Sequence, residues 1–183
     1  REQGLKNVLV TNGFINREPL EKLLPYIDAM NIDVKAFNDD FYKNICAGSL
    51  SPVKDVVKLS AAACHVEITT LIVGSLNDSP HEMTSLASWL SSIDDDIPLH
   101  ISRYYPNYQM NIWATPRATI LKLSDIAKEY LNFVYIGNLI GVDNNTYCPK
   151  CKNLLIERGY GVRLVGIQEG KCGKCGSKVD KIA

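Results

Sequence analysis

Five short apolar runs alternate with four longer amphipathic stretches between residues 7 and 137 of this 183-residue chain. The short runs, which are typical of β-strands, cover residues 7–11, 30–35, 65–73, 98–102 and 133–137. The amphipathic stretches have helical spacing and lie near residues 17–26, 52–64, 80–92 and 116–131. Strands and helices that alternate at this distance predict right-handed βαβ units and a parallel sheet.

Three of the helical stretches begin with the same kind of residue pair, a hydroxyl side chain followed by proline. A hydroxyl accepts hydrogen bonds from the free N–H groups of a first turn, and proline fits there because no N–H is needed. Ser79 with Glu82 also has the spacing of a capping box. The pairs that predict helix starts are Ser51-Pro52, Ser79-Pro80 and Thr115-Pro116.

Alternation within the strands distinguishes an open doubly wound sheet from part of a barrel. A central strand of an open parallel sheet is apolar on both faces, but three strands here place polar side chains on one face. The apolar members are Ile32, Val34, Val66, Ile68, Leu99 and Ile101, and the polar members are Asp33, Lys35, Glu67, Thr69, His100 and Ser102. One polar face suits an interior that holds a polar ligand. We therefore expect an incomplete β/α barrel.

The character of the chain changes near residue 146, where helical periodicity ends and Gly, Lys and Cys become frequent. Residues 145–183 carry eight Lys or Arg against three Asp or Glu, whereas residues 1–144 carry twelve against seventeen. We expect two modules, residues 1–144 and residues 145–183. Hydrophobic residues make up 46% of the chain, which excludes a disordered protein. No apolar run approaches the roughly 20 residues of a membrane span, and no secretory signal is visible, so we expect a cytoplasmic protein.

Four of the six cysteines form two C-x-x-C pairs separated by twenty residues. Such pairs place four thiolates at the corners of a tetrahedron, the geometry that zinc accepts, and leave no open position for catalysis. The predicted ligands are Cys148, Cys151, Cys172 and Cys175. We expect Gly173 and Gly176 to supply left-handed turns. Iron in the same tetrahedron and two disulfides are the alternatives, whereas Cys46 and Cys64 suit plain packing.

Asp33 and Lys35 are two residues apart on a predicted strand, so both side chains point to the same face. Charges that enter an interior are unfavourable unless they are paired or bound to something polar. One interpretation is a mutual ion pair at the exposed end of the strand, and the other is a pair that binds hydroxyls and a carboxylate of a ligand. Thr11-Asn12-Gly13 ends the preceding strand with a pair suited to a tight turn.

These features together resemble the radical S-adenosylmethionine (SAM) enzymes, in which a strand ending in Thr-Asn-Gly precedes a strand ending in Asp-x-Lys. The chain is most similar to the pyruvate formate-lyase activating enzyme branch, and more closely to the AmmeMemoRadiSam-system proteins. The resemblance covers nearly the whole chain and is carried by residues 24–35, 100–106, 135–138 and 146–151. It implies a partial barrel that holds a [4Fe-4S] cluster and SAM, whose reductive cleavage gives a 5′-deoxyadenosyl radical.

The resemblance also implies site residues. Asp33 and Lys35 match the residues that contact SAM, and Thr11 and Asn12 lie where the preceding strand approaches it. Arg103 and Tyr104 match the later strand end beside the adenosine. Thr69, on the polar face of its strand, completes the expected cofactor-binding set.

The family's C-x3-C-x2-C cluster loop and its Gly-Gly-Glu segment do not occur in these residues. We therefore expect the C-terminal portion of a radical SAM enzyme, inactive by itself, with an unidentified substrate for which a protein glycyl radical site is one candidate. The alternative is a non-catalytic zinc-ribbon protein that binds a protein or nucleic acid. Two aromatic residues and scattered lysines in the ribbon make nucleic acid the less favoured partner.

Overall fold

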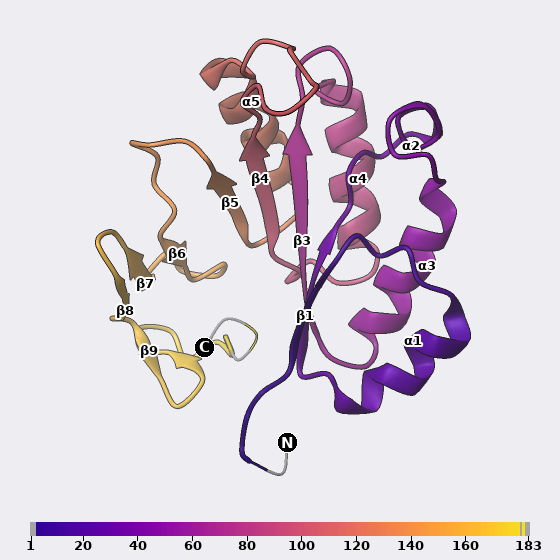
Figure 1. Ribbon diagram of the computed structural model, residues 1–183. Helices are drawn as coiled ribbons and strands as arrows, with labels where there is room; N and C mark the ends of the chain where they lie inside the picture. Colours follow the sequence, from indigo (N-terminus) through magenta and orange to yellow (C-terminus); the bar gives the residue numbers. More distant parts are fainter. Residues whose placement is uncertain (1–2, 180, 182–183) are drawn as a thin grey trace. The chain divides into compact units, whose positions relative to one another are not determined.

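The computed structural model describes residues 3–179 and 181. The chain divides into two compact units, Arg1–Leu139 and Ile140–Ala183, shown from indigo to orange and from orange to yellow in Figure 1. Among the described residues, no helix is both long enough and apolar enough to cross a membrane.

The first unit alternates strands and helices in the predicted order. A 3₁₀ turn, Leu24–Tyr26, follows the first helix. The elements are β1 (Val8–Thr11), α1 (Arg17–Leu23), β2 (Ala29–Asp33), α2 (Asp39–Asn44), α3 (Leu50–Ala61), β3 (His65–Ile72), α4 (Pro80–Ser91), β4 (Leu99–Arg103), α5 (Arg117–Lys128) and β5 (Val134–Gly137).

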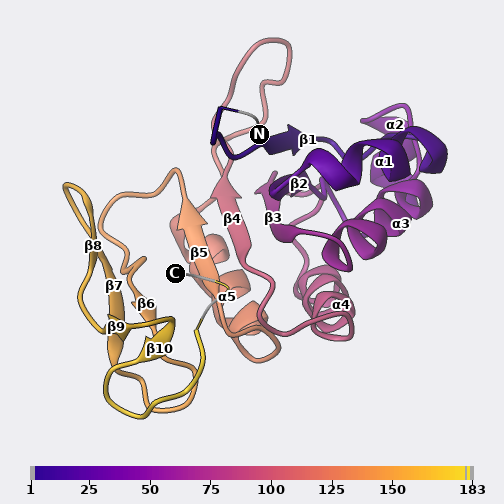
Figure 2. The same ribbon diagram turned by 90° about the horizontal axis from the view of Figure 1, so that it is seen from below.

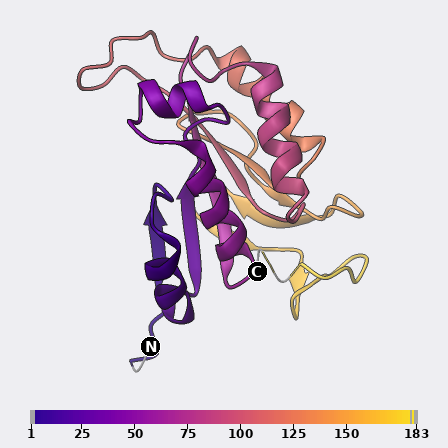
Figure 3. The same ribbon diagram turned by 90° about the vertical axis from the view of Figure 1, so that its right-hand side faces the viewer.

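The five strands form one parallel sheet in the order β1-β2-β3-β4-β5. Because each crossover joins adjacent parallel strands with the same hand, the helices return over the same face. Figures 2 and 3 show α1, α3, α4 and α5 along one side of the sheet. This singly wound arrangement confirms the predicted partial barrel and excludes a doubly wound sheet.

The core lies between the helices and the sheet. Ile32, Ile68, Leu99 and Ile101 are 0% exposed, as predicted from the alternation, and helix residues such as Leu20 are equally buried. The alternate strand residues are half-buried on the opposite side, which we call the open face. Parallel sheets bury both faces in complete domains, so an open face with polar side chains is suited to a ligand.

The helix starts differ in part from the prediction. Ser79 Oγ does accept a hydrogen bond from Glu82 N (3.1 Å), but the Glu82 carboxylate does not complete a capping box. It accepts instead from Phe37 N and Asn38 Nδ2, at 2.6 and 2.7 Å. The glutamate therefore ties the chain after β2 to α4.

The other two predicted starts are wrong by one or two residues. Helix α3 begins at Leu50 with Ser49 as its N-cap, so Pro52 lies inside the first turn. Helix α5 begins at Arg117 after an N-cap at Pro116, and the Thr115 hydroxyl donates to Ile72 O at 2.6 Å. A tertiary hydrogen bond thus replaces the local cap.

Helix α2 was not predicted. It has six residues, too few for a periodic apolar pattern, and its N-cap Asn38 accepts from Phe41 N at 2.7 Å. It buries Phe41 and Tyr42, and no pattern in the sequence predicts that either residue lies near Lys35.

The second unit contains short antiparallel strands and no helix within its described residues. Strands β6 (Thr146–Tyr147), β7 (Leu154–Arg158) and β8 (Val162–Leu164) form one sheet, and β9 (Ile167–Gln168) pairs with β10 (Lys171–Cys172). Leu155, Ile156 and Val179 pack around the buried sulfurs of Cys148 and Cys172. The small sheets around four cysteines confirm the predicted zinc-ribbon-like module.

Candidate functional site

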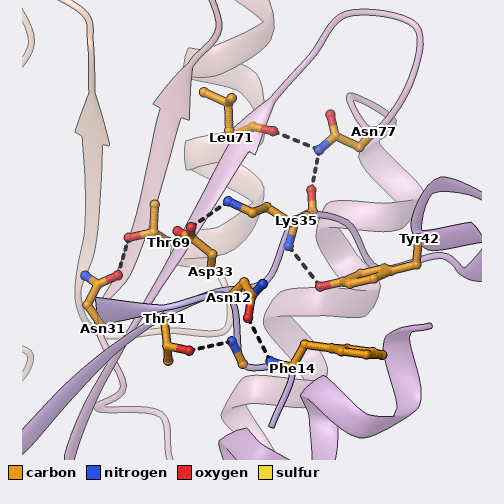
Figure 4. A network of polar contacts seen from close by, with 11 residues as sticks. Thr11, Asn12, Phe14, Asn31, Asp33, Lys35, Tyr42, Thr69, Leu71 and Asn77 are labelled. Atoms are coloured by element: carbon orange, nitrogen blue, oxygen red, sulfur yellow. Dashed lines mark hydrogen bonds and ion pairs between the residues drawn. The ribbon is translucent and has the colours of Figure 1, made fainter. Parts of the chain in front are cut away.

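Asp33 and Lys35 lie at the carboxyl end of β2 and form an ion pair. Lys35 Nζ is 2.5 Å from Asp33 Oδ2, and the side chains are 39% and 30% exposed (Figure 4). Ile32 and Val34, which alternate with them, are buried. The shared face is therefore as predicted. Because a half-exposed ion pair contributes little to stability, a ligand can replace one partner at small cost.

The main chain of Lys35 is held from two sides. Lys35 N donates to Tyr42 Oη at 3.1 Å, and Asn77 Nδ2 donates to Lys35 O at 2.7 Å and to Leu71 O at 2.8 Å (Figure 4). Asn77 Oδ1 also accepts from Val73 N at 2.7 Å. Burial raises the pKa of Tyr42 to about 12, so its hydroxyl stays protonated. Tyr42 and Asn77 thus position Lys35, and neither was a candidate in the sequence.

Thr69 lies beside Asp33 on the open face. The two residues are in register between β2 and β3, and Thr69 Oγ1 donates to Asn31 Oδ1 at 2.9 Å (Figure 4). The structure therefore brings together Asp33, Lys35 and Thr69 from the expected set.

Thr11 and Asn12 shape the turn after β1. Thr11 Oγ1 accepts from Gly13 N at 3.1 Å and Asn12 Oδ1 accepts from Phe14 N at 3.0 Å (Figure 4). Thr11 is in register with Ile32, on the helix-covered face, so its hydroxyl serves the turn. The amide nitrogen of Asn12 has no partner among the residues that the structure describes, which leaves a donor near the end of β2.

Arg103 and Tyr104 hold the loop that follows β4. Arg103 Nε donates to Thr115 O at 2.6 Å and Nη1 donates to Tyr105 Oη at 2.7 Å. Tyr104, 5% exposed, donates its hydroxyl to Met110 O at 2.7 Å. Their polar groups are engaged within this loop, so their predicted place beside an adenosine stays a prediction.

A second group of polar residues lies on the open face and was not predicted as a unit. Glu67 accepts from His100 Nε2 at 2.7 Å and contacts His65 Nε2 at 3.2 Å. The two imidazole hydrogen bonds hold the pKa of Glu67 far below its usual range, against the opposing effect of burial. Alternation placed Glu67 and His100 on polar faces, but their pairing depends on the register of β3 and β4.

The four cysteines of the second unit form one cluster. Their sulfurs lie within 4.8 Å of one another, with Cys148–Cys175 and Cys151–Cys172 separations of 3.7 Å. Zinc–sulfur bonds of about 2.3 Å in a tetrahedron place sulfurs about 3.8 Å apart. The donor set therefore fits a four-coordinate metal.

The two C-x-x-C turns share one backbone design. Lys152 N donates to Cys148 O at 2.9 Å, and Gly176 N donates to Cys172 O at 2.8 Å. Both donors have left-handed backbones, with φ of 57° and 72°. Gly176 behaves as predicted, but Gly173 has no left-handed φ and the prediction for it is wrong. In the first turn the corresponding residue is Lys152, so the left-handed backbone at this position does not require glycine.

The Asp33–Lys35 pair and the residues that support it, Tyr42 and Asn77, lie in the first half of the chain. Residues 1–90 match the Radical SAM superfamily. The matched part contains β1, β2, β3 and the Asp33–Lys35 pair. The uncharacterized protein MJ0808 of Methanocaldococcus jannaschii is 40% identical over 188 residues, covering 98% of this chain. This chain spans 56% of that relative's length.

Solved structures share the fold at low sequence identity. A domain of pyruvate-formate lyase-activating enzyme from Bacteroides vulgatus has a TM-score of 0.66 and 15% identity, covering 75% of this chain and 84% of that one. SuiB of Streptococcus suis, bound to S-adenosylmethionine, has a TM-score of 0.58 and 14% identity, covering 76% of this chain and 33% of SuiB. A radical SAM methyltransferase from Sphaerobacter thermophilus has a TM-score of 0.55 and 15% identity, with 78% and 43% covered.

Proposed function

We propose that this chain forms the C-terminal part of a radical SAM enzyme and that the Asp33–Lys35 pair contacts SAM. The observation that carries the proposal is the half-exposed ion pair at the carboxyl end of β2, on the open face, inside the matched residues. Ligands of parallel α/β proteins bind at the carboxyl ends of strands, where loops can surround them.

The chemistry of the pair suits the ends of SAM. Lys35 can donate to carboxylate or hydroxyl oxygens, and Asp33 can accept from an amino group or a ribose hydroxyl. Asn77 and Tyr42 fix the backbone of Lys35, so the ammonium starts from a defined position. When bound, SAM with a [4Fe-4S] cluster supplies a 5′-deoxyadenosyl radical that takes a hydrogen atom from the substrate.

The exposed edge strand β1 supports the proposal that this sheet is part of a larger barrel. Strand β1 is an edge strand, and its open-face side chains Val8 and Val10 are 63% and 73% exposed. Unpaired edges and exposed valines are unfavourable in a parallel sheet, because such sheets are normally covered. We infer that further parallel strands add beside β1 and that the C-x3-C-x2-C loop, absent from these residues, belongs to them.

The four-cysteine unit is proposed to bind structural zinc. All four positions of the tetrahedron are occupied by sulfur, so a metal there stabilises the unit and performs no chemistry. The [4Fe-4S] cluster has no comparable donor set in the β/α unit, where Cys46 and Cys64 are the cysteines available.

The test is reductive cleavage of SAM by protein made from the complete reading frame that contains this chain. After reconstitution with iron and sulfide, dithionite should yield 5′-deoxyadenosine and methionine, measured by liquid chromatography. The same protein without iron and sulfide is the control. A reconstituted protein that carries a cluster and leaves SAM intact would refute the proposal.

A further inference from the structure

Three side chains on the open face, His65, Glu67 and His100, form a hydrogen-bonded group beside the Asp33–Lys35 pair. Thr69, the register partner of Asp33, follows Glu67 by two residues on β3. Two residues along a strand span about 6.6 Å. Measured along the strand direction, Glu67 therefore lies about 7 Å from the position of Asp33. It therefore lines the same interior as the proposed SAM contacts.

The hydrogen bonds fix the tautomer of both histidines. Glu67 is ionised and can only accept, and its two oxygens are engaged by His65 Nε2 and His100 Nε2. Each Nε2 must therefore carry the proton, and in a neutral imidazole the Nδ1 atom is then an acceptor. Neither Nδ1 atom has a hydrogen-bond partner within the described part of the chain.

The ring of His100 is also held in orientation. It stacks on Tyr135 with a centroid separation of 5.4 Å and an interplanar angle of 29°. The side chains of His65 and His100 are each 31% exposed, so solvent or a ligand can reach them. Two acceptor atoms are thus presented on rings that cannot turn without losing a bond to Glu67.

A metal is not the ligand that this geometry favours. Among the residues that the structure describes, the groups whose ligand atoms all lie within 4.8 Å of one another are the four cysteines and Asp94–Asp96, and His65, Glu67 and His100 do not form such a group. Each oxygen of Glu67 is bound to a different ring, so the nitrogens do not converge on one point.

We propose that His65, Glu67 and His100 form a substrate subsite in which each Nδ1 atom accepts a hydrogen bond from a hydroxyl or ammonium donor of the substrate. The negative charge of Glu67 favours a neutral or cationic donor over a carboxylate or phosphate. The neighbouring Asp33 and Lys35 balance each other and do not change this preference. The proposal rests on the proposed function, because a radical formed from SAM would act on the substrate that this subsite holds.

The first experiment measures tautomers by two-bond ¹⁵N–¹H correlation NMR on the ¹⁵N-labelled chain at pH 7.5. The chain has three histidines, and exposed His81 serves as the internal control. His65 and His100 should show protons on Nε2 alone. In Glu67→Gln the amide presents one donor and one acceptor, so one of the two rings should change tautomer. A wild-type mixture of tautomers at both rings would overturn the proposal.

The second experiment titrates the wild-type chain with ethanolamine, a donor, and with acetate, which carries no donor. Ethanolamine should shift the Nδ1 resonances of His65 and His100 along a saturable curve, with a linear response at His81. Acetate should leave all three unchanged. A saturable acetate effect, or a donor response no different from that of His81, would refute the subsite. Neither experiment involves SAM, so this proposal can fail while the SAM site stands.

Discussion

Replacing Gly13 with alanine should destabilise the β/α unit by an amount that can be worked out from the turn after β1. Gly13 has φ of +68°, and a Cβ there would lie 2.9 Å from Ile32 Cγ2 and 3.1 Å from Val53 Cγ1. A left-handed alanine costs about 1–2 kcal/mol. Overpacking against a filled core costs about 1–3 kcal/mol more. The free energy of unfolding should therefore fall by about 2–5 kcal/mol.

Gly4→Ala is the matched control, because Gly4 has φ of +74° and nothing within 4 Å of a built Cβ. It should show the backbone cost alone, about 1–2 kcal/mol. Thermal unfolding followed by circular dichroism should place Gly13→Ala roughly 5–20 °C below wild type, from the usual scaling with domain size. Equal losses in the two variants would refute the close packing of this turn on β2 and α3.

Three further outcomes are expected. Cys172→Ser should lose the single zinc per chain and unfold the second unit while the β/α unit stays folded, as measured by metal analysis and limited proteolysis; loss of both units together would contradict independent modules. Tyr42→Phe leaves Lys35 N without its acceptor and should lower the free energy of unfolding in urea by about 1–3 kcal/mol; unchanged stability would contradict a structural role for this hydrogen bond. The lowered pKa of Glu67 stabilises the fold above its unfolded value near 4.5, and this contribution is lost as pH falls towards the folded pKa. The free energy of unfolding should thus fall more steeply from pH 6 to pH 3 in wild type than in Glu67→Gln, and parallel curves would contradict the assignment.

The alternation of strands and helices could be predicted because each strand–helix repeat has two apolar patterns. In the strand, apolar residues recur every two positions, and in the helix they recur about every 3.6 positions. The shared face of Asp33 and Lys35 followed from the same period of two. Their mutual ion pair was one of two interpretations, and the structure shows the pair formed. A bound ligand remains a proposal.

Contacts between distant segments could not be predicted. Helix α2 is too short to show a periodic apolar pattern, so the hydrogen bond from Lys35 N to Tyr42 Oη could not be predicted. Asn77 reaches Lys35 from 42 residues away, and Glu67 reaches His100 from 33. Those contacts depend on strand order and register. The start of α3 was misplaced because Ser49 and Ser51 are both plausible caps, and proline is accepted throughout a first turn.

The most direct test of the proposed site is the affinity for SAM of Asp33→Asn and Lys35→Met, measured by calorimetry in the reconstituted complete protein. Each lost hydrogen bond to a charged group is worth about 1.5–3 kcal/mol, so binding should weaken by about ten- to a hundredfold or more. Glu18→Gln and Lys22→Met make the same chemical changes in an exposed ion pair on α1 and should leave affinity unchanged. Zinc content should be the same in all four variants. If affinity is unchanged in Asp33→Asn and Lys35→Met while their thermal midpoints fall, the pair is structural and the assignment of the SAM site is wrong.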